Sequence, residues 1–304
     1  LGMGKNVSKS SLARANQDRD YHIFEEYAYY LVSEARQKCA NHIFKLGGNV
    51  YAFDSTTIDL CLSVFWWAKF RKKKGGIKVH TLYDVETQIP AFFHITEASV
   101  HDSKVMIEIP YEPSSYYIFD RGYNNFKILY KIHQIEAYFV VRAKKNLGYK
   151  SIQWKRRLPK NVLSDASVFL TGFYPKQYYP EPLRLVKYWD EEQEREFTFI
   201  TNAMHISALQ VAELYKNRWQ VELFFKWLKQ HLKIKRFWGT TENAVRIQIY
   251  AAICAYCLVA IIQHDMQLNR STYEVLQILS ISLTDKTHLR DLFDKTKFQN
   301  DKER

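Results

Sequence analysis

The order of the apolar segments between residues 46 and 144 most restricts the folds open to this chain. Three β-branched and aromatic runs joined by short links come first, and a further run, a helical segment and a last run follow. These segments lie at residues 49–62, 77–85, 88–98, 114–123, 124–134 and 136–144. The first three are typical of an antiparallel meander, whereas the later strand–helix–strand order requires crossovers that make its strands parallel to the first. The sequence therefore predicts an α/β fold with a mixed sheet.

The segments on either side of this region have different patterns. The N-terminal one has apolar residues at helical spacing, with Ser8 or Ser10 as the N-cap. It could be the end of a DNA-binding helical unit or an ordinary helical lead-in. After the region, polar β-patterned runs around the acidic turn "DEEQE" indicate a hairpin-rich insertion, and the rest of the chain is predicted to be helical. The expected boundaries are 1–45, 46–144, 145–206 and 207–304.

The charge of the chain narrows its class of partner. The 304 residues carry a net charge of +12, with 15% aromatic residues. A basic globular chain rich in aromatic side chains favours a polyanionic partner, most often nucleic acid. Charge alone leaves open a protein that is merely soluble and basic.

The cysteines and the longest apolar run bear on the compartment. Four cysteines are too few for a disulfide framework in a chain of this length and suit a reducing cytoplasm. Cys254 and Cys257 are predicted to be core residues one helical turn apart, not metal ligands. Their apolar run, residues 250–262, is shorter than the roughly 20 residues that span a bilayer. No secretory signal is visible, so we expect a cytoplasmic protein with no membrane partner.

Two carboxylates directly follow predicted strands. Asp54 comes after "VYAF" and Asp120 after "YYIF". A buried strand rarely ends on an unpaired carboxylate, because removing the charge from water is costly unless a partner such as a metal ion offsets it. Either acid alone could instead begin a turn, since "DSTT" fits an Asx-turn and "DRG" a loop start. Because the two share one context, we interpret them as parts of one site.

The segment "YKNRWQVELFFKWLKQHLK" has the apolar rhythm of a helix. At about 100° per residue, Tyr215, Arg218, Glu222 and Lys229 fall within an arc of roughly 60°. The alternative is a solvated face with an Arg–Glu pair four residues apart, which the aromatic rings of Tyr215 and Trp219 disfavour. We predict one helix with these four polar residues along the margin of its apolar stripe. The stripe consists of Leu214, Val221, Phe225, Leu228 and Leu232.

Together these blocks resemble a known family. The pattern Y-x2-R-x3-E-x6-K, from Tyr215 to Lys229, resembles the signature of DDE-type insertion-sequence transposases in the group named after insertion sequence four. "FDSTTI" and "FDRGY" resemble its first two acid motifs, and "RWQVELFFKWLK" resembles its third-acid helix. "IKVHTLYDVETQIP" and "VHDSKV" resemble the stretches between them. The resemblance covers about residues 45–260, with the blocks in the family's order.

The resemblance implies a ribonuclease H-like fold and a metal-binding catalytic triad of Asp54, Asp120 and Glu222. Two divalent cations, Mg²⁺ or Mn²⁺, would activate the attacking hydroxyl and stabilise the leaving oxygen. Clustered carboxylates stay ionised together only if cations offset their repulsion. The resemblance also implies a bacterial, nucleoid-associated enzyme that cuts double-stranded DNA at terminal inverted repeats and joins the 3′-hydroxyl ends to target DNA. Two ends handled together imply a homodimer, and the family commonly releases the flanking strand through a hairpin.

The same motif supplies candidate DNA contacts. By resemblance, Tyr215, Arg218 and Lys229 contact the backbone of the transposon end near the cut. Arginine can hold a phosphate as a fork and lysine as a point charge. Trp219 and Trp238 are candidates to hold an unstacked base, although a core position is the favoured interpretation of each.

A second candidate DNA contact is the basic run at residues 69–78, "KFRKKKGGIK". Its central lysines are Lys72, Lys73 and Lys74. A run of this kind is either a patch that binds phosphates or a solvated loop, and its density of charge favours phosphate contacts.

Other polar residues in the matching stretches receive structural interpretations. We expect His80 to be a satisfied strand histidine, and His101 and Asp102 to cap a helix, so none of the three is assigned as a metal ligand. Asp59 and Asp84 are acids near strand ends that we rank below Asp54 and Asp120.

Two rival functions remain open on the sequence alone. A ribonuclease H-like host nuclease or resolvase would cut DNA without strand transfer, and the Y-R-E-K pattern disfavours it. An inactive, DNA-binding transposase remnant is disfavoured by the intact acids. Members of the family usually carry more chain before the region that matches "GKNVSKSSLARAN". If that part recognises the terminal repeats, we expect this chain alone to hold the catalytic groups without specific end binding.

Overall fold

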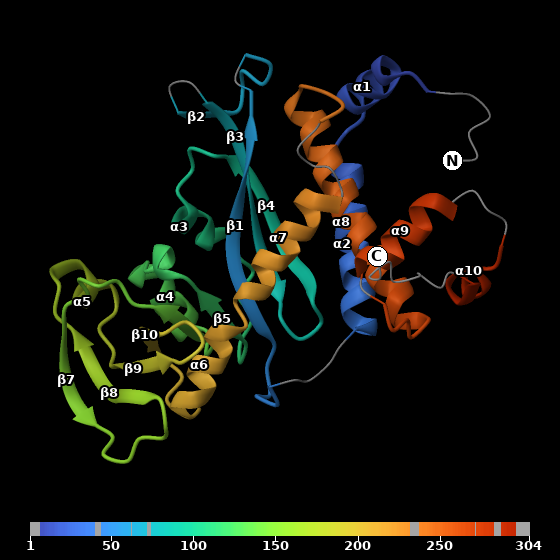
Figure 1. The fold of residues 1–304 in the computed structure, drawn as a ribbon. Coiled ribbons are helices and arrows are strands. Elements are labelled where there is room, and N and C mark those ends of the chain that lie inside the picture. The colour runs from blue at the N-terminus through green and yellow to red at the C-terminus, as the bar shows by residue number, and fades with distance from the viewer. Residues whose placement is uncertain are drawn as a thin grey trace. The chain divides into compact units, whose positions relative to one another are not determined.

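Two compact units make up the chain in the computed structural model (Figure 1). The sheet unit is Asn41–Lys226, and the helical unit combines Leu1–Ala40 with Trp227–Arg304. The structure describes residues 7–39, 44–61, 63–71, 74–231, 237–270, 272–282 and 287–295.

The sheet unit begins with an antiparallel meander. It consists of β1 (Val50–Leu60), β3 (Lys74–Asp84) and β4 (Ile89–Glu97), and the short β2 (Lys69–Arg71) pairs with the start of β3. The Asp84 side chain closes the turn to β4. Its Oδ1 accepts hydrogen bonds from the backbone N–H groups of Glu86 and Thr87, at 3.0 and 3.2 Å. The three-strand meander predicted from the sequence is confirmed.

Two parallel strands extend this meander. β5 (Tyr116–Phe119) pairs in parallel with β1, and β6 (Tyr138–Arg142) pairs in parallel with β5. The predicted mixed α/β sheet is therefore confirmed, and its order agrees with a ribonuclease H-like fold. The connecting elements are α3 (Asp102–Val105), η1 (Met106–Glu108), η2 (Arg121–Tyr123) and α4 (Phe126–Gln134).

An aromatic core covers one face of these strands. Alternate residues of β1 and β5 point to it, and Phe53 and Phe119 are both fully buried. Leu129 and Ile132 of α4 pack against them from one helix face, each 0% exposed. Burial of each such side chain contributes about 1.5–3 kcal/mol. The residue after each aromatic position therefore leaves the sheet on the opposite face.

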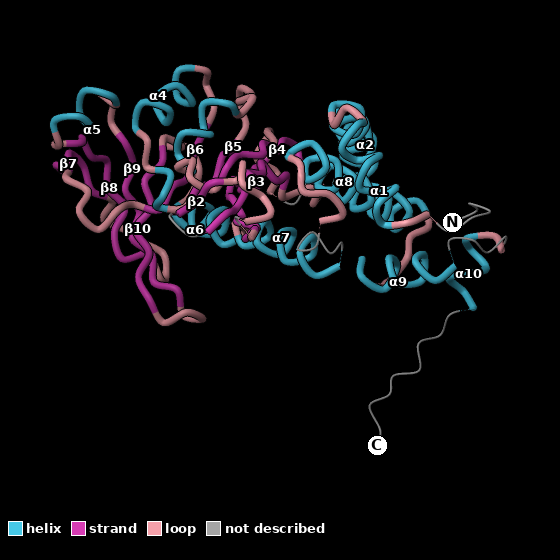
Figure 2. The backbone as a smooth tube through the Cα atoms, turned by 90° about the horizontal axis from the view of Figure 1, so that it is seen from above, coloured by secondary structure: helices cyan, strands magenta, loops and turns pink. Residues whose placement is uncertain are grey.

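The strand-rich segment after β6 continues the same sheet. β10 (Arg195–Thr201) pairs antiparallel with β6, so the chain returns to the parallel strands at its end. The resulting strand order is β2-β3-β1-β5-β6-β10-β9-β8-β7, with β4 on β3. Figure 2 shows α4 and α5 on one face of these strands and α6 on the other. The remaining elements are β7 (Tyr149–Trp154), β8 (Val162–Leu170), α5 (Phe173–Tyr178), β9 (Leu183–Asp190) and α6 (Ala208–Lys216).

The single helix predicted for the Y-R-E-K segment is wrong, because two helices share it. α6 ends at Lys216, α7 (Trp219–His231) begins three residues later, and Arg218 lies between them. The amide of Asn217 donates to the Glu213 carbonyl oxygen at 2.9 Å. An asparagine side chain that bonds the backbone in this way competes with helix continuation. The predicted apolar stripe is confirmed where it is described, since Leu214, Val221, Phe225 and Leu228 are buried, whereas Leu232 lies outside the described residues.

The helical unit contains the predicted N-terminal helices. Ser8 caps the first of them by accepting the Ser11 N–H at 3.1 Å. Lys38 and Asp265 form an ion pair at 2.5 Å between the second helix and the long C-terminal one. The helices of this unit are α1 (Lys9–Asp18), α2 (His22–Lys38), α8 (Glu242–Asp265), α9 (Thr272–Ser282) and α10 (Leu289–Lys295).

α8 is the predicted buried helix, and it is longer than its apolar run. Cys254 and Cys257 are buried free thiols on it, as expected for core residues. With 24 residues, it is the one described helix long and apolar enough to cross a membrane. Just over half of its apolar window, 56%, is buried within the protein, which is common for the core helix of a folded unit.

Candidate functional site

Strand register brings Asp54 and Asp120 together. β1 and β5 pair in parallel up to Phe53 and Phe119, so the two carboxylates are the next residues of adjacent strands. Both leave the sheet on the face opposite the aromatic core. Asp120 directly follows the last residue of β5, as predicted. The prediction that Asp54 ends a strand is wrong, because the β-branched residues after it continue β1 and pair with β3 as far as Leu60.

The residues between and on the two helices complete a polar cluster. The Arg218 guanidinium bridges two acids, with Nη1 at 2.7 Å from Asp54 Oδ2 and Nη2 at 2.6 Å from Glu222 Oε1. The Tyr215 hydroxyl donates to Asp120 Oδ1 at 2.8 Å. Asp54, Asp120 and Glu222 therefore converge on two neighbouring side chains of the same motif.

Burial and neighbouring charges shift the pKa values of Asp54, Asp120 and Arg218. Burial raises the pKa of Asp54, and the negative charges of Glu222 and Asp120 add to this effect, while Arg218 opposes it. Burial also acts against ionised Asp120, but the hydrogen bond from Tyr215 and the nearby arginines lower its pKa overall. Burial works against the charge of Arg218 as well, yet Asp54, Tyr215 and Glu222 raise its pKa. Positive charge at this position thus stabilises the ionised acids.

The donor set has the chemistry of a divalent-cation site. Carboxylate oxygens are the ligands that Mg²⁺ and Mn²⁺ prefer, and crowded carboxylates need a cation. Within the described part of the chain, no three His, Cys, Asp or Glu side chains already form a ready-made metal site. Arg218 supplies the positive charge between two of the acids, and its buried Nε has no hydrogen-bond partner. These residues fit a divalent cation that would share or take over this charge-balancing position.

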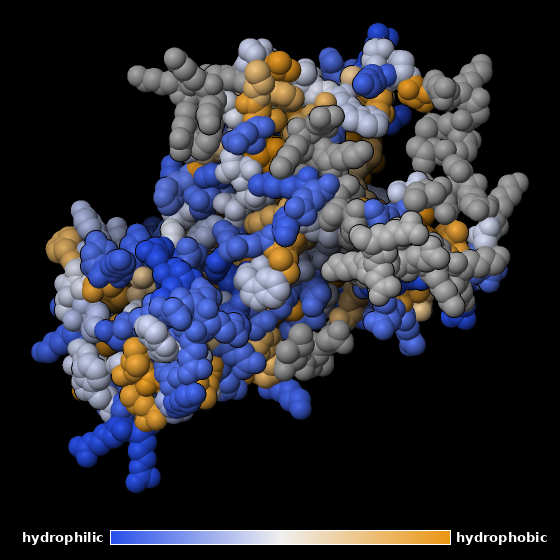
Figure 3. All heavy atoms as spheres, viewed as in Figure 1, coloured by the Kyte–Doolittle hydropathy of each residue, from blue (hydrophilic) through white to orange (hydrophobic). Residues whose placement is uncertain are grey.

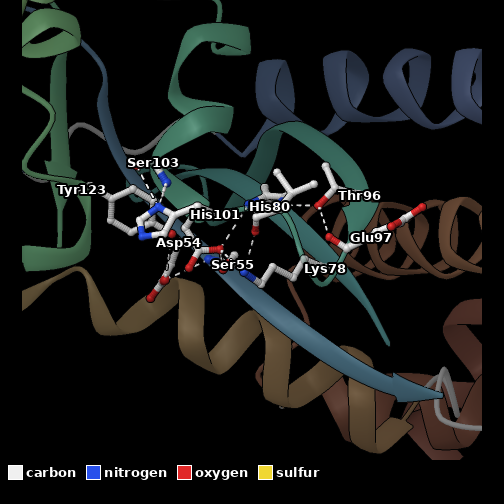
Figure 4. A network of polar contacts seen from close by, with 11 residues as sticks. Asp54, Ser55, Lys78, His80, Thr96, Glu97, His101, Ser103 and Tyr123 are labelled. Carbon is white, nitrogen blue, oxygen red and sulfur yellow. Dashed lines mark hydrogen bonds and ion pairs between the residues drawn. The ribbon is translucent and has the colours of Figure 1, made fainter. Parts of the chain in front are cut away.

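A hydrogen-bond network holds Asp54 from the other side (Figure 4). Asp54 Oδ1 accepts the Ser55 N–H at 2.8 Å and the Tyr123 hydroxyl at 3.3 Å. The Ser55 hydroxyl in turn donates to Asp102 Oδ1 at 2.8 Å, and Lys78 Nζ lies 3.0 Å from the same oxygen. The sequence singled out neither Tyr123 nor Ser55, although both lie within the two acid motifs.

The histidines have structural positions. His80 is fully buried in β3, as expected for a strand histidine, and its Nε2 lies 2.9 Å from Thr96 Oγ1. It is only partly satisfied, because its buried Nδ1 has no hydrogen-bond partner and lies 3.9 Å from Asp102 Oδ1. Burial lowers its pKa to about 4. His101 caps α3 by accepting the Ser103 N–H, also as predicted. Asp102 takes part in the Ser55–Lys78 network instead of capping the helix with its side chain.

The lower-ranked acids are also structural or peripheral. Asp84 binds the backbone of its turn, and Asp59 is exposed on β1. Neither joins the cluster around Arg218, so their lower rank agrees with the structure.

A large cavity lies beside the carboxylates. It measures about 720 Å³, and Asp120, Tyr215, Arg218, Trp219 and Glu222 line one side of it. The β9–β10 hairpin and α6 line the rest. Figure 3 shows hydrophilic side chains gathered over this part of the sheet unit. The cavity is wide enough for a nucleotide-sized group.

The two tryptophans are not core residues. Trp219 is 49% exposed and lines the cavity beside the carboxylates. Trp238 is 59% exposed and belongs to the helical unit, where it lines a cavity with Ser10 and Arg14. The favoured prediction of a core position is therefore wrong for both, because each side chain keeps about half of its surface in solvent.

The predicted basic contacts have mixed outcomes. Lys72 and Lys73 lie outside the described residues, and Lys74 begins β3. Lys78, at the end of the basic run, is no outward contact, since its Nζ binds Asp102 and donates to the Val100 carbonyl oxygen at 2.8 Å. Lys229 lies on α7 seven residues after the acid of the motif, on the same side of the helix.

Sequence reasoning missed Arg142. It ends β6, and its Nη1 lies 3.9 Å from Asp120 Oδ1, while its guanidinium lies over the Phe197 ring at 4.9 Å. The signal was present, because "FVVRAKK" places a basic run directly after a buried strand.

The chain is similar to a known protein family and to individual named proteins. A family model described as a transposase DDE domain matches residues 45–258. A Sinorhizobium fredii protein named as transposase y4zB is 37% identical over 79% of this chain and 67% of its own length. A Geobacillus stearothermophilus protein named as the transposase of insertion sequence element IS5377 is 27% identical over 82% of this chain and 66% of its own length. The chain thus spans about two thirds of the length of these relatives.

A further relative matches a longer part of the chain. It is a Synechocystis protein named as the transposase of insertion sequence element IS4SA, 25% identical over 93% of this chain and 80% of its own length.

Proposed function

Because this chain belongs to the DDE transposase family, we propose that it cuts DNA at the terminal inverted repeats of its own insertion sequence and joins the ends to target DNA. The observation that supports this function best is the convergence of Asp54, Asp120 and Glu222 on Arg218 and Tyr215. We propose these three acids as the catalytic, metal-binding residues.

Each side chain has a chemical task in this proposal. Mg²⁺ or Mn²⁺, as two ions, would supply activation of the attacking oxygen and stabilisation of the leaving one. Asp54 and Asp120 present their oxygens from adjacent strands, which holds them more rigidly than loops would. Tyr215 fixes the orientation of Asp120 through its hydroxyl. Arg218 can transfer its fork from the acids to a DNA phosphate.

The DNA partners follow from the same positions. Tyr215, Arg218 and Lys229 are proposed to contact the backbone of the transposon end, and Lys72, Lys73 and Lys74 the flanking backbone. Trp219, exposed in the cavity beside the acids, is positioned to stack on an unpaired base, and Trp238 remains a candidate for such a contact. A homodimer that holds two ends, in the bacterial cytoplasm and near the nucleoid, completes the proposal.

The decisive substrate comes from the element itself. DNA flanking the reading frame should contain inverted repeats with a short direct duplication outside them. A duplex bearing one repeat, incubated with the full chain and Mg²⁺ or Mn²⁺, should be nicked at the repeat boundary. A pre-cut end should be joined to a target plasmid. Cleavage without joining would instead support a nuclease, and loss of all metal-dependent nicking would support a DNA-binding remnant.

The triad assignment is tested by Glu222→Ala. We expect cleavage of the repeat duplex to fall at least about 100-fold, a loss typical of removing one electrostatic group from an active site. DNA affinity measured in EDTA should not fall, because without a metal ion the acid repels phosphates instead of helping to bind them. Glu213→Ala is the matched control, since this exposed acid of α6 lines the same cavity, whereas the ion pairs of Arg218 are with Asp54 and Glu222. Equal cleavage by both variants would remove Glu222 from the triad.

A further inference from the structure

A second, smaller cavity opens where the parallel strands end. It measures about 250 Å³ and is lined by Arg121, which follows Asp120, and by Arg142, which ends β6. Lys187 of β9 and Thr198 of β10 form its floor, on the sheet face of the aromatic core. The cavity therefore lies on the opposite sheet face from the larger one, at the same strand ends.

The charge of the small cavity is strongly positive. Its described lining contains one carboxylate, Glu196, which lies 3.7 Å from Lys187 Nζ. The cations are Arg121, Arg142, Lys144, Lys145 and Lys187. So many like charges around one small space repel one another, and an anion bound among them would relieve that repulsion.

The large cavity is richer in acids. Its lining includes six acids, Asp120, Asp190, Glu191, Glu192, Glu213 and Glu222, and four cations, Arg142, Arg195, Lys216 and Arg218. Arg142 lines both cavities and thus forms the wall between them. Cations are needed to hold a scissile phosphate next to the acids. A DNA strand that continues from there past Arg142 would meet the permanent positive charge of the small cavity.

The size and lining of the small cavity identify its ligand class. Ligand pockets for whole small molecules usually measure about 300–1,000 Å³, and this one is smaller. Its aromatic lining residue is Tyr149, at the rim and 37% exposed. A single phosphate group fits such a site better than a base does, because arginine forks and lysine ammonium groups match phosphate oxygens.

We infer that the basic cavity of Arg121, Arg142, Lys144, Lys145 and Lys187 is a subsite for one backbone phosphodiester of DNA, next to the phosphate that is cut. This inference rests on the proposed function and extends it to the other face of the sheet. The phosphate belongs either to the transposon end or to the target strand, and the two sources are separated by experiment.

The test uses two double variants of the full chain. Lys144→Ala with Lys145→Ala removes two exposed cations of the cavity, and Lys150→Ala with Lys176→Ala removes two exposed lysines that line neither cavity. Binding of a labelled pre-cut end duplex is measured by anisotropy across a NaCl series in EDTA. Each lost phosphate contact should lower the slope of log K against log salt by about 0.9. We expect that loss for the cavity variant and not for the control.

Single methylphosphonate substitutions then locate the contact. A methylphosphonate at one position of the end duplex should weaken binding by the unaltered protein. The same substitution should not change binding by the cavity variant, because that variant has already lost the cations that contact this phosphate. If the slope changes only for a repeat-free target duplex, the subsite holds target DNA. An unchanged slope on both duplexes, in a protein that still cleaves repeat ends, would overturn the subsite alone. Absence of repeat cleavage would instead count against the proposed function.

Discussion

Arg218 sets the electrostatic state of the site at the scale of single residues. Its two Nη atoms hold Asp54 and Glu222, and its charge opposes the rise that burial causes in the pKa of Asp54. A divalent ion that enters the site must compete with this guanidinium. DNA phosphate and metal would then act together, because the phosphate offers Arg218 a new partner while the metal takes the acids.

Arg218→Ala should therefore raise the affinity of the DNA-free protein for Mn²⁺ several-fold, since it leaves the carboxylates without their positive neighbour. Calorimetric or EPR titration of Mn²⁺ gives this affinity independently of catalysis. Arg246→Ala is a close control. Its pair with Glu242 is also four residues apart, with side-chain exposures of 20% and 53% against 16% and 55% at Arg218–Glu222. Equal or weaker Mn²⁺ binding by Arg218→Ala would contradict the competition.

His80 makes stability depend on pH. Burial lowers its pKa to about 4 from 6.5, so the unfolded chain binds this proton more readily than the folded one. The contribution of neutral His80 to the free energy of unfolding is fully present above pH 6.5 and is lost as the pH falls towards about 4. We expect a loss of roughly 2 kcal/mol between about pH 7.5 and pH 4.5 in urea unfolding. His80→Gln should lose less over the same range, and an identical pH slope would refute the assignment.

At the scale of elements, a buried ion pair ties the strands after β6 to the start of α6. Arg184 of β9 holds both carboxylate oxygens of Asp165 at 2.8 Å and donates to the Ala203 and Ile206 carbonyl oxygens. Those carbonyls lie just before the Ser207 cap of α6. The helix that carries Tyr215 is thus positioned partly from the far strands of the sheet.

Asp165→Ala should destabilise the protein by about 3–5 kcal/mol, because it leaves the Arg184 charge buried without its partner. Lys155→Ala removes the other cation of Asp165, which lies at 3.1 Å and is 55% exposed. Such a surface contact contributes less than about 1 kcal/mol. Urea unfolding of both variants measures the difference, and similar losses would show that the buried pair has no special weight.

At the scale of the whole molecule, the sequence revealed the strands and the acids because these depend on local pattern. Alternation and β-branching defined the meander, and "VYAFD" with "YYIFD" indicated one shared site. Strand register then placed Asp54 beside Asp120, which two equal-length apolar runs before the acids already suggested. Whether a segment forms a helix or a strand can be predicted from the sequence where its apolar residues recur with a clear period.

The remaining features depend on particular side-chain and backbone contacts that the apolar period does not contain. The break between α6 and α7 follows from the Asn217 side chain, and an apolar period continues across it. The pairing of β10 with β6 joins residues far apart in the chain. Lys78 was predicted to belong to a surface patch, but it forms an ion pair with Asp102 and its side chain is only 13% exposed. The helix break is decided by one local side-chain hydrogen bond, and the other two outcomes are decided by tertiary partners.

The short parallel pairing of β1 with β5, from Val50 to Phe53, makes the codons of this stretch unusually sensitive to deletion. Side chains alternate along a strand, so an in-frame deletion of a single codon there would turn Asp54 towards the aromatic core. Such a copy would still be translated in full beyond the lesion and would keep nearly all of its apolar content. An insertion sequence could thus be silenced in its host by losing three nucleotides, with no stop codon or frameshift to mark the event.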